Sequence, residues 1–169
     1  MKKNLILTGM MGVGKSTVGK NLSVKLNMNF IDTDKVVENN ESMSISEIFE
    51  QKGEKYFRGV EKEICIASIK KRGCIIALGG GAFIDSDIRE AVLNTCICFW
   101  LDIDVELLSK RLIESKKRPL LNNMNLKKKL IDIYEKRKKI YGLANYRIDC
   151  NKNSATSITK EITEIYETK

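Results

Sequence analysis

The sequence predicts an α/β fold in which helices cover both faces of one parallel sheet. Short apolar runs typical of buried strands alternate along the chain with segments whose apolar residues recur at helical spacing. No internal repeat or low-complexity linker interrupts this alternation. The length of 169 residues suits one hydrophobic core rather than two. We therefore expect a single domain over residues 1–169.

Five segments have the composition of strands. They are KNLILTG at residues 3–9, NFID at 29–32, CIIAL at 74–78, CICFWL at 96–101 and YRID at 146–149. In the fourth strand, alternation with a period of two places Cys96, Cys98 and Trp100 on one face. The two cysteines of that strand are expected to act as small apolar residues.

Helices are expected in the intervals between these strands. After the first strand, Val18 and Leu22 fall at helical spacing. Ser44 and Glu47 have the form of a capping box, which predicts a helix that runs to about Gln51. Further helices are expected at residues 53–73, 85–93, 104–113 and 126–141, and after Ser154.

The composition indicates an anionic partner and a reducing compartment. The formal net charge is +8, but the basic clusters near Arg118 and at residues 127–139 hold few aromatic residues. We interpret most of these lysines as a solvated helix face rather than a nucleic-acid surface. Five cysteines without a C-x-x-C pair or any histidine favour reduced thiols in the cytoplasm over a metal cluster. No apolar run approaches the length of a membrane span.

The first motif with chemistry is a phosphate-binding loop (P-loop). GMMGVGKST, from Gly9 to Thr17, matches G-x-x-x-x-G-K-[ST] where the first strand meets the first helix. Its glycines let backbone N–H groups converge on an anion, and the helix start adds partial positive charge. Lys15 can then reach the β and γ phosphates, and Ser16 can hold Mg²⁺. The predicted nucleotide site comprises Gly12, Val13, Gly14, Lys15, Ser16 and Thr17.

This loop also explains the N-terminus, where Lys2 and Lys3 precede an apolar stretch in the manner of a secretory signal. Because the stretch is the strand that leads into the P-loop, we reject export. A P-loop does not by itself separate kinases from GTPases and motor ATPases. The guanine-reading motif Asn-Lys-x-Asp is incomplete at residues 151–154, which end in Ser154, and the chain is short for a motor. These exclusions leave a small kinase, which needs a separate pocket for the molecule that accepts the phosphoryl group.

Two carboxylates are candidates for that pocket. Asp32 and Asp34 are two residues apart in FIDTD, so in an extended strand both would emerge at its carboxyl end. One could face hydrated Mg²⁺ and the other an acceptor hydroxyl. The alternative is that Asp34 only caps a helix that begins near Lys35.

Arg58 and the glycines after the third strand are each open to two interpretations. Arg58 has Glu54 at i−4 and Glu61 at i+3, so it forms either a surface ion pair or a guanidinium held by Glu61 toward an anionic substrate. Residues 79–81 are three consecutive glycines, which is a costly way to end a strand. They form either a turn or a wall where a substrate approaches the backbone.

The whole set of motifs resembles the shikimate kinase family. GMMGVGKST, FIDTD, FRGVE, LGGGAF, RPLL and EKRKKIY before YRID occur in that family's order and approximate spacing. The resemblance implies a nucleoside-monophosphate-kinase type of three-layer α/β sandwich with strand order 2-3-1-4-5. It also implies an acceptor-binding helical region at about residues 33–61 and a lid at about residues 112–124. The implied reaction moves the γ-phosphoryl of ATP to the 3-hydroxyl of shikimate, giving ADP and shikimate 3-phosphate on the route to chorismate.

On the acceptor side, the resemblance implies that Asp34 contacts the shikimate hydroxyls. Arg58 and Arg137 would bind the shikimate carboxylate. Gly79, Gly80 and Gly81 would bring backbone N–H groups to the same molecule, which favours the wall over the turn.

On the nucleotide side, the resemblance implies that Ser16 ligates Mg²⁺ while Asp32 acts through water. Arg118 in the lid would join Lys15 on the transferring phosphates, so that Lys15, Asp34 and Arg118 form the catalytic set. Arg111 would lie near the nucleotide, as would Lys152, although the family's arginine and Asn-Pro after the fifth strand are absent here.

The expected partners are ATP with Mg²⁺ and shikimate, bound by a cytoplasmic monomer without nucleic acid or membrane. Two alternatives stay open at this stage. One is a related small-metabolite kinase such as gluconate kinase, and the other is a nucleotide-dependent module that binds RNA or protein.

Overall fold

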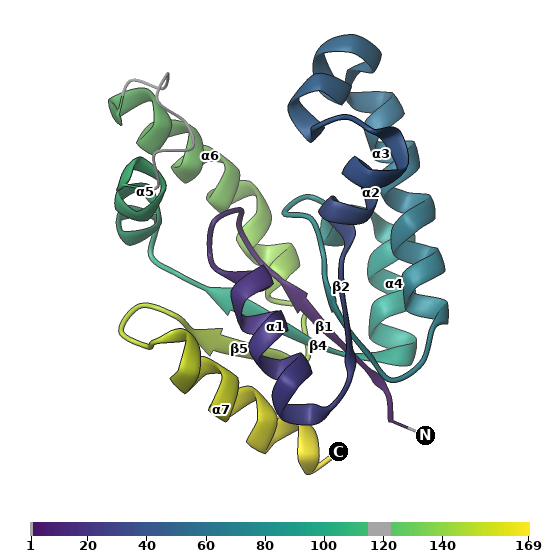
Figure 1. Cartoon of the computed structure of the whole chain (residues 1–169). Coiled ribbons are helices and arrows are strands. Elements are labelled where there is room, and N and C mark those ends of the chain that lie inside the picture. Colours follow the sequence, from purple (N-terminus) through teal and green to yellow (C-terminus); the bar gives the residue numbers. More distant parts are fainter. Residues whose placement is uncertain (1, 115–122) are drawn as a thin grey trace.

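A five-stranded parallel sheet organises the structure, a computed structural model that describes residues 2–114 and 123–169 (Figure 1). The strands are β1 (Asn4–Thr8), β2 (Asn29–Asp32), β3 (Cys74–Ala77), β4 (Cys96–Asp102) and β5 (Tyr146–Asp149). Their order is β2-β3-β1-β4-β5, and all four pairings are parallel. The predicted fold class, strand direction and strand order are confirmed.

Helices cover both faces of this sheet. They are α1 (Lys15–Leu26), α2 (Thr33–Glu41), α3 (Ile45–Lys70), α4 (Ser86–Thr95), α5 (Val105–Glu114), α6 (Asn123–Tyr141) and α7 (Ala155–Glu167), with a short 3₁₀ turn, η1, at Ala82–Ile84. In Figure 1, α1 and α7 lie side by side on one face, and α4 and α6 lie on the other. Because the strands are parallel, the loops after β1, β2, β3 and β4 meet at one edge of the sheet.

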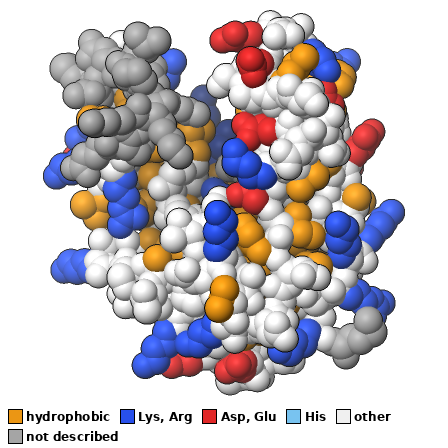
Figure 2. Space-filling view, viewed as in Figure 1, with side chains coloured by type: hydrophobic (Ala, Val, Ile, Leu, Met, Phe, Trp, Pro, Cys, Tyr) orange, Lys and Arg blue, Asp and Glu red, His pale blue; other side chains and the backbone are white. Residues whose placement is uncertain are grey.

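Two helical projections rise from that edge. One consists of α2 with the first half of α3, and the other of α5 with the first half of α6 (Figure 1). Figure 2 shows the surface hollowed between them, with basic and acidic side chains along the hollow. The first projection has a small core of its own, formed by Val37, Ile48, Phe57 and Ile64. This core is separate from the main cluster around the sheet.

Two local predictions need correction. The helices expected at residues 44–51 and 53–73 form one element, α3, which is kinked where Gly53 adopts φ 81°. Helix α2 begins at Thr33, and its N-cap is Asp32, whose carboxylate accepts from the backbone N–H of Lys35. Asp34 therefore neither caps the helix nor extends from the same strand as Asp32. It lies in the first turn of α2.

The cysteines and the termini agree with the expected packing. All five cysteines are free and buried, as predicted. The apolar N-terminal stretch is β1, whose five residues are all buried at the centre of the sheet. In the part of the chain that the structure describes, no helix has the length and apolar character needed to span a membrane.

Candidate active site

The loop between β1 and α1 has the backbone of a phosphate cradle. Gly9, Gly12 and Gly14 adopt φ values of 137°, 80° and 104°, a region that side chains disfavour. Gly14 occupies the N-cap position of α1 and offers no side chain to cap it. The first-turn N–H groups of α1 are therefore directed toward a site where an anion is stabilised.

Lys15 folds back over this loop. Its Nζ donates to the carbonyl oxygens of Gly9 at 2.8 Å and of Met10 at 2.9 Å. Burial lowers the Lys15 pKa to about 8, although Asp34 and Asp32 act in the opposite direction. The ammonium group is thus held beside both carboxylates, and added negative charge from a phosphate would favour its charged form.

Ser16 and Asp32 meet across the loop. The Ser16 hydroxyl donates to Asp32 Oδ2, so the side chains expected at the metal come together from α1 and the end of β2. A hydroxyl and a carboxylate are hard oxygen donors of the kind that Mg²⁺ takes, with water and phosphate completing its octahedron. Within the described ranges, no group of three or more His, Cys, Asp or Glu side chains could hold a metal by itself. The residues present therefore fit a metal that is brought with phosphates.

A second site lies beside the P-loop, in a cavity of about 280 Å³. Its lining includes Asp34, Arg58, Glu61, Gly80, Gly81 and Arg137. Asp34 comes from α2, Arg58 and Glu61 from α3, the glycines from the loop after β3, and Arg137 from α6. Residues from α2, α3, α6 and the loop after β3 therefore converge on one cavity.

Two carboxylates flank Gly79 at the floor of this region. A Cβ atom at Gly79 would collide with Asp34 Oδ1 and would lie 2.6 Å from Glu61 Oε1, so any other residue there would displace the two carboxylates. Burial raises the pKa of Asp34, and Lys15 opposes that shift. Burial also raises the pKa of Glu61, and Arg58 opposes it. In both acids, burial disfavours the charged form and a neighbouring cation favours it.

Arg58 is not part of an ordinary exposed ion pair. Its Nη1 lies 2.6 Å from Glu61 Oε2, and the Glu61 side chain is only 3% exposed. The contact with Glu54 is longer, at 3.4 Å, and is exposed on both sides. A Cβ atom at Gly81 would lie 2.6 Å from Arg58 Nη1. The guanidinium is therefore held by a buried partner against the glycine loop. This agrees with an arginine that is positioned by Glu61 rather than with a surface ion pair.

Arg137 approaches the same loop from the opposite side. Its Nη1 donates to the carbonyl oxygen of Gly80 at 2.9 Å. The hydroxyl of Tyr141, one turn later on α6, donates to the same oxygen. The structure thus brings Arg58, Arg137 and the three glycines together at one cavity, next to Asp34.

The family is decided by a match over nearly the whole chain. The family model described as Shikimate kinase matches residues 11–167. This chain belongs to the shikimate kinase family. The sequence-based expectation of an ATP-dependent phosphotransferase that acts on shikimate is thereby confirmed.

Individual relatives agree with this assignment. A shikimate kinase from Sulfurihydrogenibium sp. is 41% identical over 160 residues, which cover 95% of each chain. The structure of the shikimate kinase from Acinetobacter baumannii in complex with shikimate matches with a TM-score of 0.91 at 32% identity, covering 99% of this chain and 94% of that one. The Aquifex aeolicus shikimate kinase matches with a TM-score of 0.83 at 33% identity, covering 97% and 96%.

A gluconokinase from Sinorhizobium meliloti shares the fold with this shikimate kinase family member. Its TM-score is 0.59 at 13% identity, over 98% of this chain and 94% of that one. The likeness extends to the fold alone. Membership of the shikimate kinase family therefore takes precedence over the gluconate kinase alternative.

The resemblance assigned three further residues, Arg111, Arg118 and Lys152, to the nucleotide side. Arg118 and most of the predicted lid fall outside them. Arg111 lies on α5 near the buried thiol of Cys150, whose pKa burial raises to about 12. Lys152 is exposed in the turn after β5. Arg111 and Lys152 are thus both found near the carboxyl end of β5.

Sequence reasoning missed two hydroxyl groups that hold the end of β3 and the glycine loop after it beside this cavity. The Thr33 hydroxyl donates to the carbonyl oxygen of Ala77 and accepts from the N–H of Gly79, so it ties α2 to the end of β3. Tyr141 holds Gly80 as described above. A threonine between two acids and a tyrosine four residues after Arg137 were visible in the sequence, but nothing local shows what they contact.

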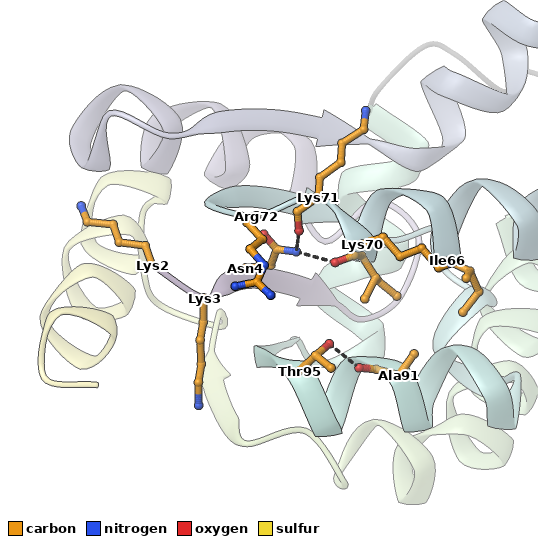
Figure 3. A pocket seen from close by; sticks show the side chains of 10 residues that line it. Lys2, Lys3, Asn4, Ile66, Lys70, Lys71, Arg72, Ala91 and Thr95 are labelled. Atoms are coloured by element: carbon orange, nitrogen blue, oxygen red, sulfur yellow. Dashed lines mark hydrogen bonds between the residues drawn. The ribbon is translucent and has the colours of Figure 1, made fainter.

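A separate hollow of about 410 Å³ lies at the amino ends of the strands, whereas the P-loop lies at their carboxyl ends (Figure 3). Five basic residues line it, at positions 2, 3 and 70–72. Figure 3 shows the side chains of Lys2, Lys3 and Lys71 pointing in different directions away from Asn4. Lys70 lies in the last turn of α3, where a cation is favoured by the helix dipole. The side chains of Lys2, Lys3 and Lys71 do not converge on one point, so the cavity beside the P-loop remains the candidate active site.

Proposed function

We propose that this chain carries out its family's reaction, phosphorylation of the 3-hydroxyl of shikimate by ATP, in the cavity that lies between α2, α3 and α6. The observation that carries the proposal is the placement of Arg58, Arg137 and Asp34 around one cavity adjacent to Lys15. Two guanidinium groups suit a carboxylate, and an acid suits hydroxyl groups. Shikimate carries both kinds of group.

On the acceptor side, Arg58 and Arg137 bind the shikimate carboxylate. Asp34 accepts hydrogen bonds from the hydroxyl groups and orients the one that attacks. Gly79, Gly80 and Gly81 keep the wall free of side chains, which is supported by the collisions that a Cβ atom would make at Gly79 and Gly81. With no histidine in the chain, a carboxylate is the suitable acceptor for the proton that the hydroxyl loses.

On the nucleotide side, residues 12–17 hold the phosphates through backbone N–H groups and the Lys15 ammonium. Ser16 would hold Mg²⁺, and Asp32 would act on it through water. When bound, Mg²⁺ neutralises charge on the β and γ phosphates. Arg118 approaches the transferring phosphate with the lid, while Arg111 and Lys152 lie on the side of the base.

Phosphoryl transfer passes through a loose transition state, so alignment and positive charge matter more than a strong base. Lys15 and Arg118 supply that charge, and Asp34 fixes the line of attack. The helix α6 and the Glu61 carboxylate hold the two arginines that anchor the far end of the acceptor. Arg58 is held by the buried Glu61 carboxylate, and Arg137 by the carbonyl oxygen of Gly80.

We also propose one P-loop kinase domain over residues 1–169, with an acceptor region at about 33–61 and a lid at about 112–124. The protein acts in the cytoplasm as a monomer and binds neither nucleic acid nor membrane.

An assay with several acceptor molecules tests this proposal directly. ADP release is measured with shikimate, gluconate and nucleoside monophosphates as acceptors at matched concentrations, with and without Mg²⁺. We expect Mg²⁺-dependent turnover with shikimate only. Comparable turnover with gluconate, or salt-sensitive RNA binding without kinase activity, would contradict the proposal.

A further inference from the structure

A buried carboxylate at the end of β4 has three hydrogen-bond donors from two other elements. Asp102 accepts from the Tyr134 hydroxyl of α6 at 3.0 Å. It also accepts from Arg147 of β5, from Nε at 2.8 Å and from Nη2 at 2.7 Å. The Asp102 side chain is 6% exposed. A buried charge with this many partners is geometrically fixed, because each lost donor would leave it incompletely paired.

The Tyr134 contact lies on the face of α6 that bears the acceptor-binding arginine. Tyr134, Arg137 and Tyr141 are spaced at i, i+3 and i+7, which places them on one side of the helix. Arg137 and Tyr141 both donate to the carbonyl oxygen of Gly80. The helix is therefore attached at two places, to β4 through Tyr134 and to the loop after β3 through Arg137 and Tyr141.

A second route connects the same residues through aromatic rings. The Arg147 guanidinium lies over the Trp100 ring, 5.3 Å from its centroid. The Trp100 ring is in turn 6.0 Å from the Tyr141 ring. Asp102, Arg147, Trp100 and Tyr141 therefore form a chain of side-chain contacts, and helix α6, which carries both Tyr141 and Tyr134, closes this chain into a circuit.

Trp100, a member of this circuit, and its neighbour Leu101 lie against the backbone of the P-loop. A Cβ atom at Gly9 would lie 2.5 Å from the carbonyl oxygen of Leu101 and 3.5 Å from Trp100 Cδ1. Gly9 is the residue whose carbonyl holds Lys15. The P-loop is also held by the Lys15 ammonium, which donates to the carbonyl oxygens of Gly9 and Met10.

We propose that Asp102 is a positioning residue for shikimate binding. Through the Tyr134 hydroxyl it fixes α6 against the sheet, and this sets the place of the Arg137 guanidinium in the acceptor cavity. The inference rests on the proposed function, because the role of Arg137 is part of it. Neither Asp102 nor Tyr134 lines the cavity that holds Arg137.

The first test removes only the hydroxyl of Tyr134. Tyr134→Phe is expected to raise the shikimate KM about fivefold, the effect of losing one hydrogen bond, and to leave kcat and the ATP KM within about twofold of the parent. Asp102→Asn should also raise the shikimate KM. The matched control is Tyr146→Phe, since the Tyr146 hydroxyl makes no hydrogen bond within the described ranges, and the contacts of its ring with Phe99 and Lys169 do not need the hydroxyl.

A cycle with Arg137 separates this inference from the proposed function. In an Arg137→Ala background, Tyr134→Phe should not raise the shikimate KM further, because the residue through which it acts is gone. An equal rise in both backgrounds would overturn the inference, as would a lower melting temperature with an unchanged shikimate KM. If Arg137→Ala itself left the shikimate KM unchanged, the role proposed for Arg137 would fail, and the positioning role of Asp102 would fail with it.

Binding without turnover gives an independent readout. Trp100 is the only tryptophan of the chain and belongs to the circuit, so its fluorescence should respond when shikimate is titrated into the protein. The dissociation constant for shikimate should rise by the same factor as the KM in Tyr134→Phe and stay unchanged in Tyr146→Phe. An unchanged dissociation constant in Tyr134→Phe would contradict the inference.

Discussion

Arg58 donates to Glu61 at 2.6 Å, and only the arginine of this pair is open to solvent, with 37% of its side chain exposed against 3% for the glutamate. The buried partner fixes the guanidinium at the edge of the acceptor cavity. Glu61→Gln should therefore raise the shikimate KM about tenfold, the effect of losing a charge-assisted hydrogen bond, with little change in the ATP KM. Steady-state kinetics with each substrate varied in turn measures both constants.

The matched control for that variant is Glu54→Gln. Glu54 is the other acidic neighbour of Arg58, but its contact is 3.4 Å long and its side chain is 67% exposed. Exposed pairs of this kind contribute little, so both constants should remain near the parent values. Equal losses in the two variants would show that Arg58 needs negative charge nearby rather than the buried carboxylate.

Lys15 should be indispensable for the chemical step. Lys15→Ala removes a positioned cation from the transferring phosphates and should lower kcat by on the order of 10²-fold or more. Arg118→Ala is expected to have a similar effect through the same phosphates. Lys20→Ala, an exposed lysine of α1, is the control and should leave kcat unchanged. Near-parental turnover of Lys15→Ala at saturating substrates would show that the role is wrong.

The glycines after β3 should differ in which substrate they affect. A Cβ atom at Gly81 would lie 2.6 Å from the Arg58 Nη1, so Gly81→Ala should displace the guanidinium and raise mainly the shikimate KM. At Gly80 the nearest atom is the backbone N of Met11 in the P-loop, at 3.2 Å. Gly80→Ala should therefore affect the KM values of both substrates.

The control for these glycine variants is Gly59→Ala. Gly59 lies inside α3, has no positive φ, and has open space where a Cβ would be placed. Alanine there should increase the free energy of unfolding by roughly 0.5–1 kcal/mol and leave both KM values unchanged. Identical kinetics for Gly81→Ala and Gly59→Ala would mean that the loop after β3 does not form the pocket wall.

Stability should fall at high pH because buried thiols resist ionisation. Burial raises the pKa of Cys65 from 9.0 to about 12. Between those values the folded protein binds more protons than the unfolded chain, so the free energy of unfolding decreases as the pH rises from about 9 toward 12. Urea titrations at a series of pH values measure how steeply the free energy of unfolding falls with pH. The fall should be less steep in Cys65→Ala. A slope that is the same in both proteins would contradict this account.

The same burial predicts slow thiol chemistry in the native state. All five cysteines are buried, so a thiol reagent such as DTNB should modify them only as the protein unfolds. Addition of denaturant should then release five equivalents of reactive thiol. Rapid labelling of any cysteine under native conditions would show local opening that the packing does not suggest.

The sequence was sufficient for the features that depend on neighbouring residues. The spacing of glycines with Lys15 and Ser16 located the P-loop, and alternation of strands and helices located the sheet. It was not sufficient to distinguish Asp32 from Asp34 as the cap of α2, since both are good caps and the choice depends on where β2 ends.

The contacts that sequence reasoning missed join elements distant along the chain. Asp102 meets residues 134 and 147 only because α6 and β5 pack against the end of β4. Tyr134 alone could equally be a surface tyrosine, and Asp102 alone could be a helix cap. Their relation follows from tertiary packing, which no periodicity in the sequence encodes.

Kinetics of Arg58→Ala test the central claim most directly, that the cavity between α2, α3 and α6 binds shikimate through its carboxylate. The KM for shikimate and the KM for ATP are measured for the parent protein and for this variant under identical conditions. We predict a rise of about tenfold or more in the shikimate KM, with the ATP KM within about twofold of the parent value. An unchanged shikimate KM would contradict the account and return Arg58 to the role of a surface ion pair.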